Sequence, residues 1–293
     1  MVEGSLVDDR GRGRSTPPGK APVMPTFIYG TAWKEDETAR LTRLALACGF
    51  RAIDTANQRR HYHEAAVGEA LSELFGEGRI TRQEVFLQTK FTSLAGQDQR
   101  LPFDPRAAVA IQVHQSCASS LEHLGVERLD CYLLHGPAGH SGLAPADLEA
   151  WQAMEELRAR GATRLIGVSN FSVDQLETLC EHAATPPAVV QNRCFARLGW
   201  DREVRAVCRE RGIAYQAFSL LTANLRELAS PAFRRLVERV RRTPAQVVFR
   251  FAQQVGMVPL TGTGSPDHMR EDLGCAGFDL SPGDLRLIET LAV

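Results

Sequence analysis

The chain has 293 residues, of which 44% are hydrophobic and 24% are charged, and its formal net charge at pH 7 is −1. This length suits one α/β barrel or two medium domains, and the composition is ordinary for a soluble globular protein. A net charge near zero excludes a general attraction to nucleic acid or anionic membranes, and the apolar runs are too short to cross a bilayer.

The seven cysteines are scattered and form no CxxC pair. This pattern predicts buried thiols in a reducing compartment, and we expect a cytoplasmic protein. Cysteines and histidines do not recur at zinc-ligand spacing, so we expect no metal site.

The first predicted segment is a tail over residues 1–24. Its stretch GSLVDDRGRGRSTPPGKAP has almost no large apolar side chain and cannot bury enough surface to order itself. The RGRGR run has no apolar segment after it, which excludes a secretory signal. We therefore expect a disordered tail followed by one domain over residues 25–293.

From residue 25 onward, short β-branched or aromatic runs alternate with segments of helical periodicity. Eight strands are predicted, at residues 26–29, 52–54, 85–89, 129–134, 165–168, 189–191, 214–218 and 257–260. Ser172 and Gln175 form a capping box, and Thr243 with Pro244 marks another helix start. Glycine, which adopts the left-handed conformation without a steric penalty, ends four predicted helices: Gly49, Gly125, Gly212 and Gly256.

Eight strand–helix units predict a single (β/α)8 TIM barrel of the α/β class. No GxGxxG motif follows the first strand, which argues against a Rossmann domain. No shift in composition marks a second domain.

Four polar side chains follow strands 2, 3 and 4, where a barrel of this kind places its active site: Asp54, Tyr62, Lys90 and His135. Singly, each has an ordinary interpretation as a turn, loop, surface or rim residue. Together they can transfer a proton, because a phenol with a pKa near 10 donates more readily beside an ammonium group. Lys90 would supply that charge, Asp54 would hold Lys90, and a neutral His135 would orient a carbonyl oxygen.

Six motifs in this order make the chain resemble the aldo-keto reductases over residues 27–291, and their diketogulonate-reductase-like branch in particular: IDTANQRRHYHEAAVGEAL, VFLQTKF, LDCYLLHGP, IGVSNF, VVQN and VPLTGTGSPDHMREDL. The resemblance implies an NAD(P)H-dependent reductase of aldehydes or ketones, with NADPH the expected cofactor and NADH possible. Tyr62 would be the general acid, tuned by Lys90 and Asp54. The expected partner is a small carbonyl substrate, and the expected state is a monomer.

The resemblance also implies a set of cofactor-binding residues. Thr31 lies in the matching Gly-Thr segment, and Phe218 would stack on the nicotinamide. The remaining positions are Ser169, Asn170 and Gln191 for the carboxamide, Ser219 and Leu221 for the pyrophosphate, Gly262, Thr263 and Ser265 for phosphate oxygens, Glu271 and Asp272 for the adenine, and His268 and Arg270 for a 2′-phosphate.

The chain departs from the family pattern in several places. Many members have five residues from the catalytic aspartate to the tyrosine, a count that ends here on Arg59, so Tyr62 is aligned through the following glutamate. Phe218 replaces a tyrosine, and the lysine often found after the strand 8 proline is absent. The chain also stops soon after the last helix, so we expect an open substrate mouth with Trp33 as one wall.

Two other functions fit the same residues. One is a cofactor-binding sensor or regulatory subunit with little turnover. The other is a barrel aldolase that uses Lys90 as a Schiff-base nucleophile.

Overall fold

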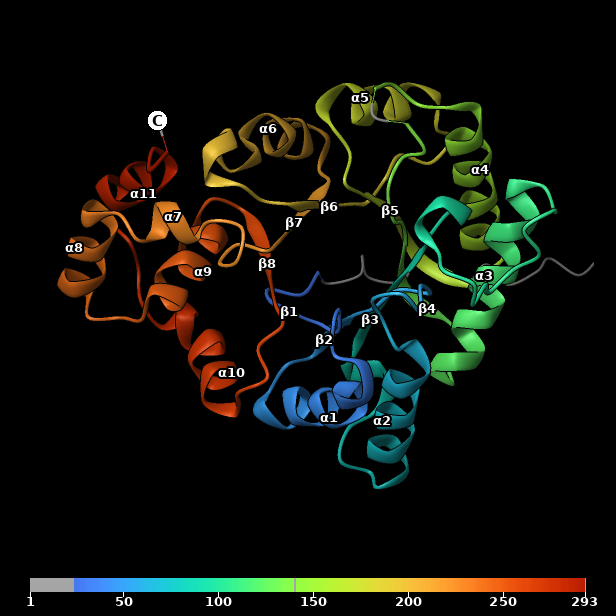
Figure 1. The fold of residues 1–293 in the computed structure, drawn as a ribbon, viewed down its shortest axis with the longest axis horizontal. Helices are drawn as coiled ribbons and strands as arrows, with labels where there is room; N and C mark the ends of the chain where they lie inside the picture. Colours follow the sequence, from blue (N-terminus) through green and yellow to red (C-terminus); the bar gives the residue numbers. More distant parts are fainter. Residues whose placement is uncertain (1–23, 140, 293) are drawn as a thin grey trace, which may run out of the picture.

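A computed structural model describes residues 24–139 and 141–292 of the chain, and it contains eight parallel strands that close into a barrel in chain order (Figure 1). The strands are β1 (Ile28–Gly30), β2 (Ala52–Asp54), β3 (Phe86–Phe91), β4 (Leu129–Leu134), β5 (Thr163–Ser169), β6 (Val189–Arg193), β7 (Ala214–Phe218) and β8 (Met257–Thr261). The barrel closes where β1 pairs with β8, with Ile28 opposite Leu260. The predicted fold is confirmed.

Helices surround the barrel, and α8 and α11 pack together on its outside (Figure 1). The α-helices are α1 (Thr38–Cys48), α2 (Glu64–Gly76), α3 (Val109–Leu124), α4 (Pro145–Ala159), α5 (Val173–His182), α6 (Arg202–Arg211), α7 (Leu225–Leu228), α8 (Pro231–Val240), α9 (Pro244–Gln254), α10 (Pro266–Leu273) and α11 (Pro282–Glu289). The 3-10 helices are η1 (Glu35–Glu37), η2 (Arg82–Glu84), η3 (Leu94–Gly96), η4 (Ala196–Asp201) and η5 (Gly274–Gly277).

The ends of several elements differ from the predicted ones by a few residues. β1 pairs with its neighbours only from Ile28, whereas β3 continues to Phe91, which lies opposite Leu134 of β4. Hydrogen bonding to the neighbouring strand decides where each strand ends, and the composition of one strand alone does not show how far that pairing extends. The predicted capping box of α5 is present, with Gln175 N–H donating to Ser172 Oγ.

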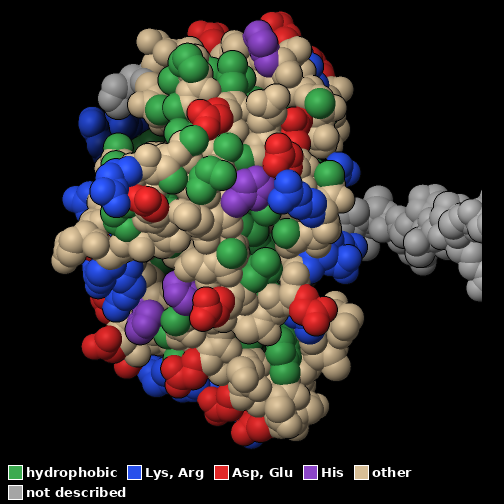
Figure 2. All heavy atoms as spheres, turned by 90° about the vertical axis from the view of Figure 1, so that its right-hand side faces the viewer, with side chains coloured by type: hydrophobic (Ala, Val, Ile, Leu, Met, Phe, Trp, Pro, Cys, Tyr) green, Lys and Arg blue, Asp and Glu red, His purple; other side chains and the backbone are tan. Residues whose placement is uncertain are grey.

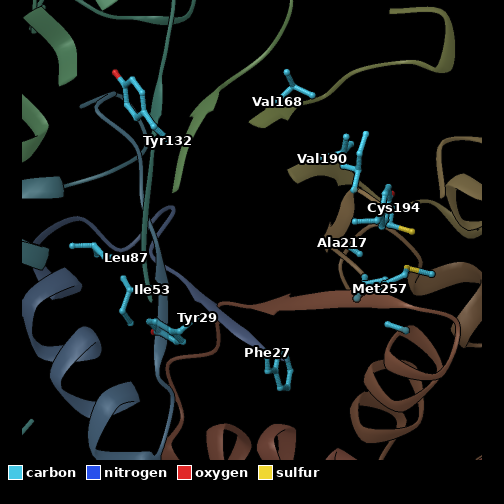
Figure 3. Close-up of a cluster of buried hydrophobic side chains, with 14 of the residues drawn as sticks. Phe27, Tyr29, Ile53, Leu87, Tyr132, Val168, Val190, Cys194, Ala217 and Met257 are labelled. Carbon is cyan, nitrogen blue, oxygen red and sulfur yellow. The ribbon is translucent and has the colours of Figure 1, made fainter. Parts of the chain in front are cut away.

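Alternation along the strands separates an outer apolar layer from the barrel interior. Ile53 and Leu87 turn outward into the core shared with the helices (Figure 3). Their neighbours Asp54 and Gln88 hydrogen-bond to each other and are buried. Ile28 and Ala52, the first residues of β1 and β2, form a small buried apolar cluster with Leu260 of β8. The interior is therefore apolar at one end and polar where the predicted site lies.

Helix α2 packs so closely on α3 that Gly68 has no room for a side chain. A Cβ at this position would overlap the backbone oxygen of His123. This close approach fixes the helix that begins directly after the loop carrying Tyr62.

The expected tail lies outside the described residues except for Met24, which packs against Cys131, Leu133 and Val189. None of the helices within the described ranges is long and apolar enough to cross a membrane. Acidic and basic side chains are mixed over the face in Figure 2. All seven cysteines are free thiols, and the described part of the chain has no cluster of His, Cys, Asp or Glu suited to a metal ion.

Candidate active site

A buried ion pair joins β2 to β3 at the C-terminal end of the barrel. Lys90 Nζ lies 2.6 Å from Asp54 Oδ2 and also donates to Thr55 O at 2.8 Å. Only 1% of the surface of Lys90 and 3% of that of Asp54 is exposed. The ammonium is thus held between a carboxylate and a carbonyl oxygen inside the barrel.

The loop after β2 brings Tyr62 to this ion pair. Lys90 Nζ lies 5.1 Å from the centroid of the Tyr62 ring. Tyr62 N–H donates to Gln58 O at 3.1 Å, in a turn that takes up the extra residues of the loop. Arg59, the other residue that alignment leaves open, instead pairs with Glu35 at 3.0 Å. Of the two candidates, the tyrosine is the one beside the lysine.

Two residues beyond Tyr62, Glu64 fastens the end of this loop to the outside of the barrel. Its carboxylate, at the start of α2, is 4% exposed and accepts a hydrogen bond from Thr89 Oγ1, next to Lys90 in β3. The other carboxylate oxygen lies 3.1 Å from His123 Nδ1 on α3. The segment that carries Tyr62 is therefore anchored to the strand that carries Lys90.

His135 follows β4 and completes the group. Its ring lies edge-on to the Tyr62 ring, with centroids 5.9 Å apart. Its backbone N–H donates to Phe91 O, and its backbone oxygen accepts from Asn170 Nδ2 at 2.8 Å. The four predicted catalytic side chains thus lie together at one end of the barrel.

The charges of these groups follow from their surroundings. Burial raises the pKa of Tyr62; the Lys90 ammonium lowers it and the Asp54 charge raises it again, and the net shift is upward. Burial lowers the pKa of Lys90, but the attraction of Asp54 and Tyr62 is larger together, so this pKa is raised. Burial, followed by the Lys90 charge, lowers the pKa of His135 to about 3. At pH 7 the site holds a neutral phenol, an ammonium ion and a neutral imidazole.

Three glutamines that share one hydrogen-bond network support Asp54 from inside the barrel. Gln88 and Gln191 donate to Asp54 Oδ1 at 2.7 and 3.0 Å. Gln88 and Gln216 exchange two hydrogen bonds, each of 2.9 Å. Gln88 and Gln216 were not predicted. Their signal is strand parity, because each lies two residues before a predicted site residue and so faces the same side.

Several residues predicted to bind a cofactor lie at the strand ends, and the side chains of some of them already hydrogen-bond within the protein. Thr31 is buried, and both its N–H and its hydroxyl donate to Asp54 O. Gln191 is engaged in the barrel network. Asn170 and Ser219 have φ of 61° and 57°, left-handed values that are uncommon away from glycine and that cluster at functional sites.

The loop from β8 to α10 carries the predicted phosphate-binding residues. Ser265 caps α10 by accepting from His268 N–H, and Thr263 Oγ1 accepts from Ser265 N–H at 3.2 Å. His268 and Arg270 are exposed, and Arg270 pairs with Asp267 at 3.0 Å.

Of the two predicted adenine contacts, Glu271 is exposed and Asp272 is buried. Asp272 accepts a hydrogen bond from Thr261 Oγ1 at 2.8 Å, and burial raises its pKa to about 6. The carboxyl of Asp272 on α10 is therefore hydrogen-bonded to the last residue of β8. Leu221 and Phe218, the last predicted positions near the cofactor, are partly buried.

Lys34 was missed by the sequence reasoning. It follows the predicted Gly-Thr segment and Trp33, and its Nζ donates to Gly262 O, which follows the neighbouring strand β8. Burial lowers the pKa of Lys34. A Cβ on Gly262 would lie 3.3 Å from Gly30 O and 3.6 Å from Lys34 Nζ. The backbone of Gly262 is therefore packed closely between the end of β1 and the Lys34 amine.

Trp33 stands at the rim of the mouth. It is 70% exposed, and its ring lies 3.9 Å from that of His61. Its backbone N–H donates to His61 O at 2.7 Å, which ties the first loop to the loop that carries Tyr62.

Comparison with known proteins identifies the family of the chain. Residues 25–292 match the model of the aldo/keto reductase family. An aldo-keto reductase of Mycobacterium avium is 34% identical over 92% of this chain and 86% of its own length. Aldose reductase B of Dictyostelium discoideum is 29% identical over 92% of this chain and 88% of its own. The crystal structure of an aldo/keto reductase from Brucella melitensis superposes with a TM-score of 0.77 at 26% identity, over 92% and 95% of the two chains. The chain therefore belongs to the aldo/keto reductase family and is an oxidoreductase.

Proposed function

We propose that the protein reduces aldehydes or ketones to alcohols with NADPH, and that Tyr62 is the general acid. The observation that carries this proposal is the neutral Tyr62 phenol beside the Lys90–Asp54 ion pair and the neutral ring of His135. The proposal includes one reductase domain over residues 25–293, a monomer in the cytoplasm, and membership of the diketogulonate-reductase-like branch. That branch rests on the sequence motifs alone.

The chain offers suitable groups for the cofactor. The β8–α10 loop, with the small residues Gly262 to Ser265, would bind phosphate oxygens through backbone N–H groups, helped by Lys34. Exposed His268 and Arg270 favour a 2′-phosphate and hence NADPH. When bound, NADPH supplies the hydride that reduces the carbonyl carbon.

The side chains then perform the proton chemistry. The carbonyl oxygen would lie between the Tyr62 hydroxyl and the His135 ring, where it takes the phenolic proton as negative charge develops on it. Lys90 stabilises the phenolate that remains, because an opposite charge nearby favours the charged form. Asp54 holds Lys90 as an ammonium ion. In alcohol oxidation the same phenolate would accept the proton.

The aldolase alternative requires an uncharged Lys90 amine as nucleophile. Instead, Lys90 donates to Asp54 and Thr55, and its pKa is raised. These contacts disfavour a Schiff base at this lysine. The sensor alternative shares the whole binding site and differs only in turnover.

The test is Tyr62→Phe, which removes the hydroxyl and keeps the ring. NADPH absorbance is followed with an activated aromatic aldehyde, and NADPH binding is measured by protein fluorescence. We expect turnover to fall by about 10²–10⁴-fold, the usual contribution of a general acid, with NADPH affinity retained. Arg59→Gln in the same loop is the matched control and should keep its turnover.

Full turnover in Tyr62→Phe would refute the role of this tyrosine. NADPH binding without wild-type turnover on a panel of aldehydes and ketones would favour the sensor alternative. Borohydride trapping of a substrate on Lys90 would favour the aldolase.

A further inference from the structure

Thr92, two residues after Lys90, contacts the catalytic histidine from the side. Its Oγ1 lies 2.6 Å from His135 Nδ1, and its side chain is almost fully buried. Threonine hydroxyls and neutral imidazole nitrogens can each donate or accept, so the distance alone leaves the direction of this hydrogen bond open.

Counting protons decides the direction. The imidazole is neutral at pH 7, so one ring nitrogen carries hydrogen and the other is an acceptor. Within residues 24–139 and 141–292, Thr92 Oγ1 has no other hydrogen-bond partner than His135. If Nδ1–H were the donor, the threonine proton would stay buried without an acceptor, which is unfavourable. If Thr92 donates, both groups are satisfied and the ring hydrogen lies on Nε2.

The local backbone holds Thr92 in place for this contact. Gln97 Nε2 donates to Thr92 O at 3.1 Å and also to Asn57 O at 2.9 Å. The methyl group of Thr92 lies against Gly96, where an added Cβ would come within 2.6 Å of it. Packing on one side and a hydrogen bond on the other restrict the rotamer, so the hydroxyl stays directed at the imidazole.

The second ring nitrogen is free to act on a substrate. His135 Nε2 has no hydrogen-bond partner among the described residues, and the Tyr62 ring lies edge-on to the imidazole. A hydrogen on Nε2 would make this neutral ring a donor to an oxygen atom in the site. A hydrogen on Nδ1 would instead leave Nε2 with a lone pair, which repels a carbonyl oxygen.

We propose that Thr92 is a positioning residue for carbonyl reduction: its hydroxyl donates to His135 Nδ1, keeps the ring hydrogen on Nε2, and so makes His135 a hydrogen-bond donor to the substrate oxygen. This inference rests on the proposed function for its last step. The tautomer itself depends only on the contact between Thr92 and His135.

The experiment compares Thr92→Val, which replaces the hydroxyl by a methyl group of similar size, with Thr92→Ser, which keeps the hydroxyl. The ¹⁵N chemical shifts of His135, assigned by comparison with His135→Gln, report the tautomer in the protein without substrate. In the wild type we expect a pyridine-type Nδ1 and a pyrrole-type Nε2. Thr92→Ser should keep this pattern, and Thr92→Val should show a mixture of tautomers.

Kinetics supply the second measurement. Losing one neutral hydrogen bond predicts a kcat about five- to tenfold lower in Thr92→Val, with unchanged NADPH affinity, and a kcat within about twofold of wild type in Thr92→Ser. A pyrrole-type Nδ1 in the wild type, or equal kcat values for the two variants, would overturn the inference. If the tautomer is as stated but the wild type reduces no carbonyl compound, the proposed function fails instead.

Discussion

Removing the Lys90 ammonium should destabilise the fold strongly, and removing its partner as well should restore much of the loss. Asp54 is buried and accepts hydrogen bonds from Lys90, Gln88 and Gln191. In Lys90→Met the carboxylate keeps only the two amide donors and lacks a counter-charge. Breaking a buried ion pair on one side typically costs about 3–5 kcal/mol. That is a large part of the ~5–15 kcal/mol by which domains are stable.

The double variant Lys90→Met/Asp54→Asn carries no buried charge at this pair, and its asparagine oxygen can still accept from the two glutamines. We expect it to unfold with a free energy within about 1–2 kcal/mol of wild type, because neutral replacements of buried ion pairs are well tolerated. Both variants should lose reductase turnover, which would separate the proposed catalytic role of Lys90 from its structural one.

Urea unfolding measures both variants, with fluorescence of the buried Trp151 and Trp200 as the probe. Two results would refute the reasoning. One is a free energy of unfolding of Lys90→Met that lies within about 1 kcal/mol of the wild-type value. The other is a double variant that is no more stable than the single one.

Three further predictions concern titratable groups outside this pair. The pKa of Asp272 is about 6 in the fold, above its unfolded value, so its protonated form stabilises the fold at low pH and this stability is lost as pH rises through 6. Asp272→Asn should therefore be more stable than wild type at pH 8, by on the order of 2 kcal/mol, and equally stable near pH 3 in urea unfolding. The hydrogen bond with Glu64 raises the pKa of His123, so its contribution is present below about pH 6.5 and is lost as pH rises through the folded pKa. The stability difference between wild type and His123→Gln should then shrink on raising the pH from 6 to 9. Burial raises the pKa values of the thiols of Cys117, Cys194 and Cys208. At pH 8 an aromatic disulfide reagent should therefore react with the native chain far more slowly than with the unfolded chain, and fast reaction of these three thiols in the native chain would contradict their burial.

The barrel and the ion pair could be predicted from the sequence because their signals are local. Runs of β-branched residues between helical stripes indicate strands, and the C-terminal ends of parallel strands meet at one edge of a barrel. Asp54 and Lys90 end neighbouring strands and carry opposite charges, so their pairing follows from fold and charge alone.

The remaining contacts could not be predicted, because they depend on how distant segments register after the barrel closes. Gln88 meets Gln216 across the interior, 128 positions away in the chain. Lys34 meets Gly262 over 228 positions. Nothing in the sequence around a glutamine or a lysine in a short polar segment indicates which distant residue it will contact. Asp272 illustrates the opposite problem, since the family resemblance placed it beside the adenine, whereas the helix turns its side chain inward onto Thr261.

The amide network has a consequence for dividing the chain into two halves. Gln88 lies in β3 and Asp54 in β2, while their partners Gln216 and Gln191 lie in β7 and β6. Three hydrogen bonds of this network therefore join the first four strands to the last four, in addition to the backbone pairing of β4 with β5 and of β1 with β8. A fragment ending after β4 would leave its own polar interior without these partners, at about 1–3 kcal/mol for each group that stays buried. We therefore expect neither half-barrel to be stable by itself, and we expect two separately produced halves to recover native structure only by assembling with each other.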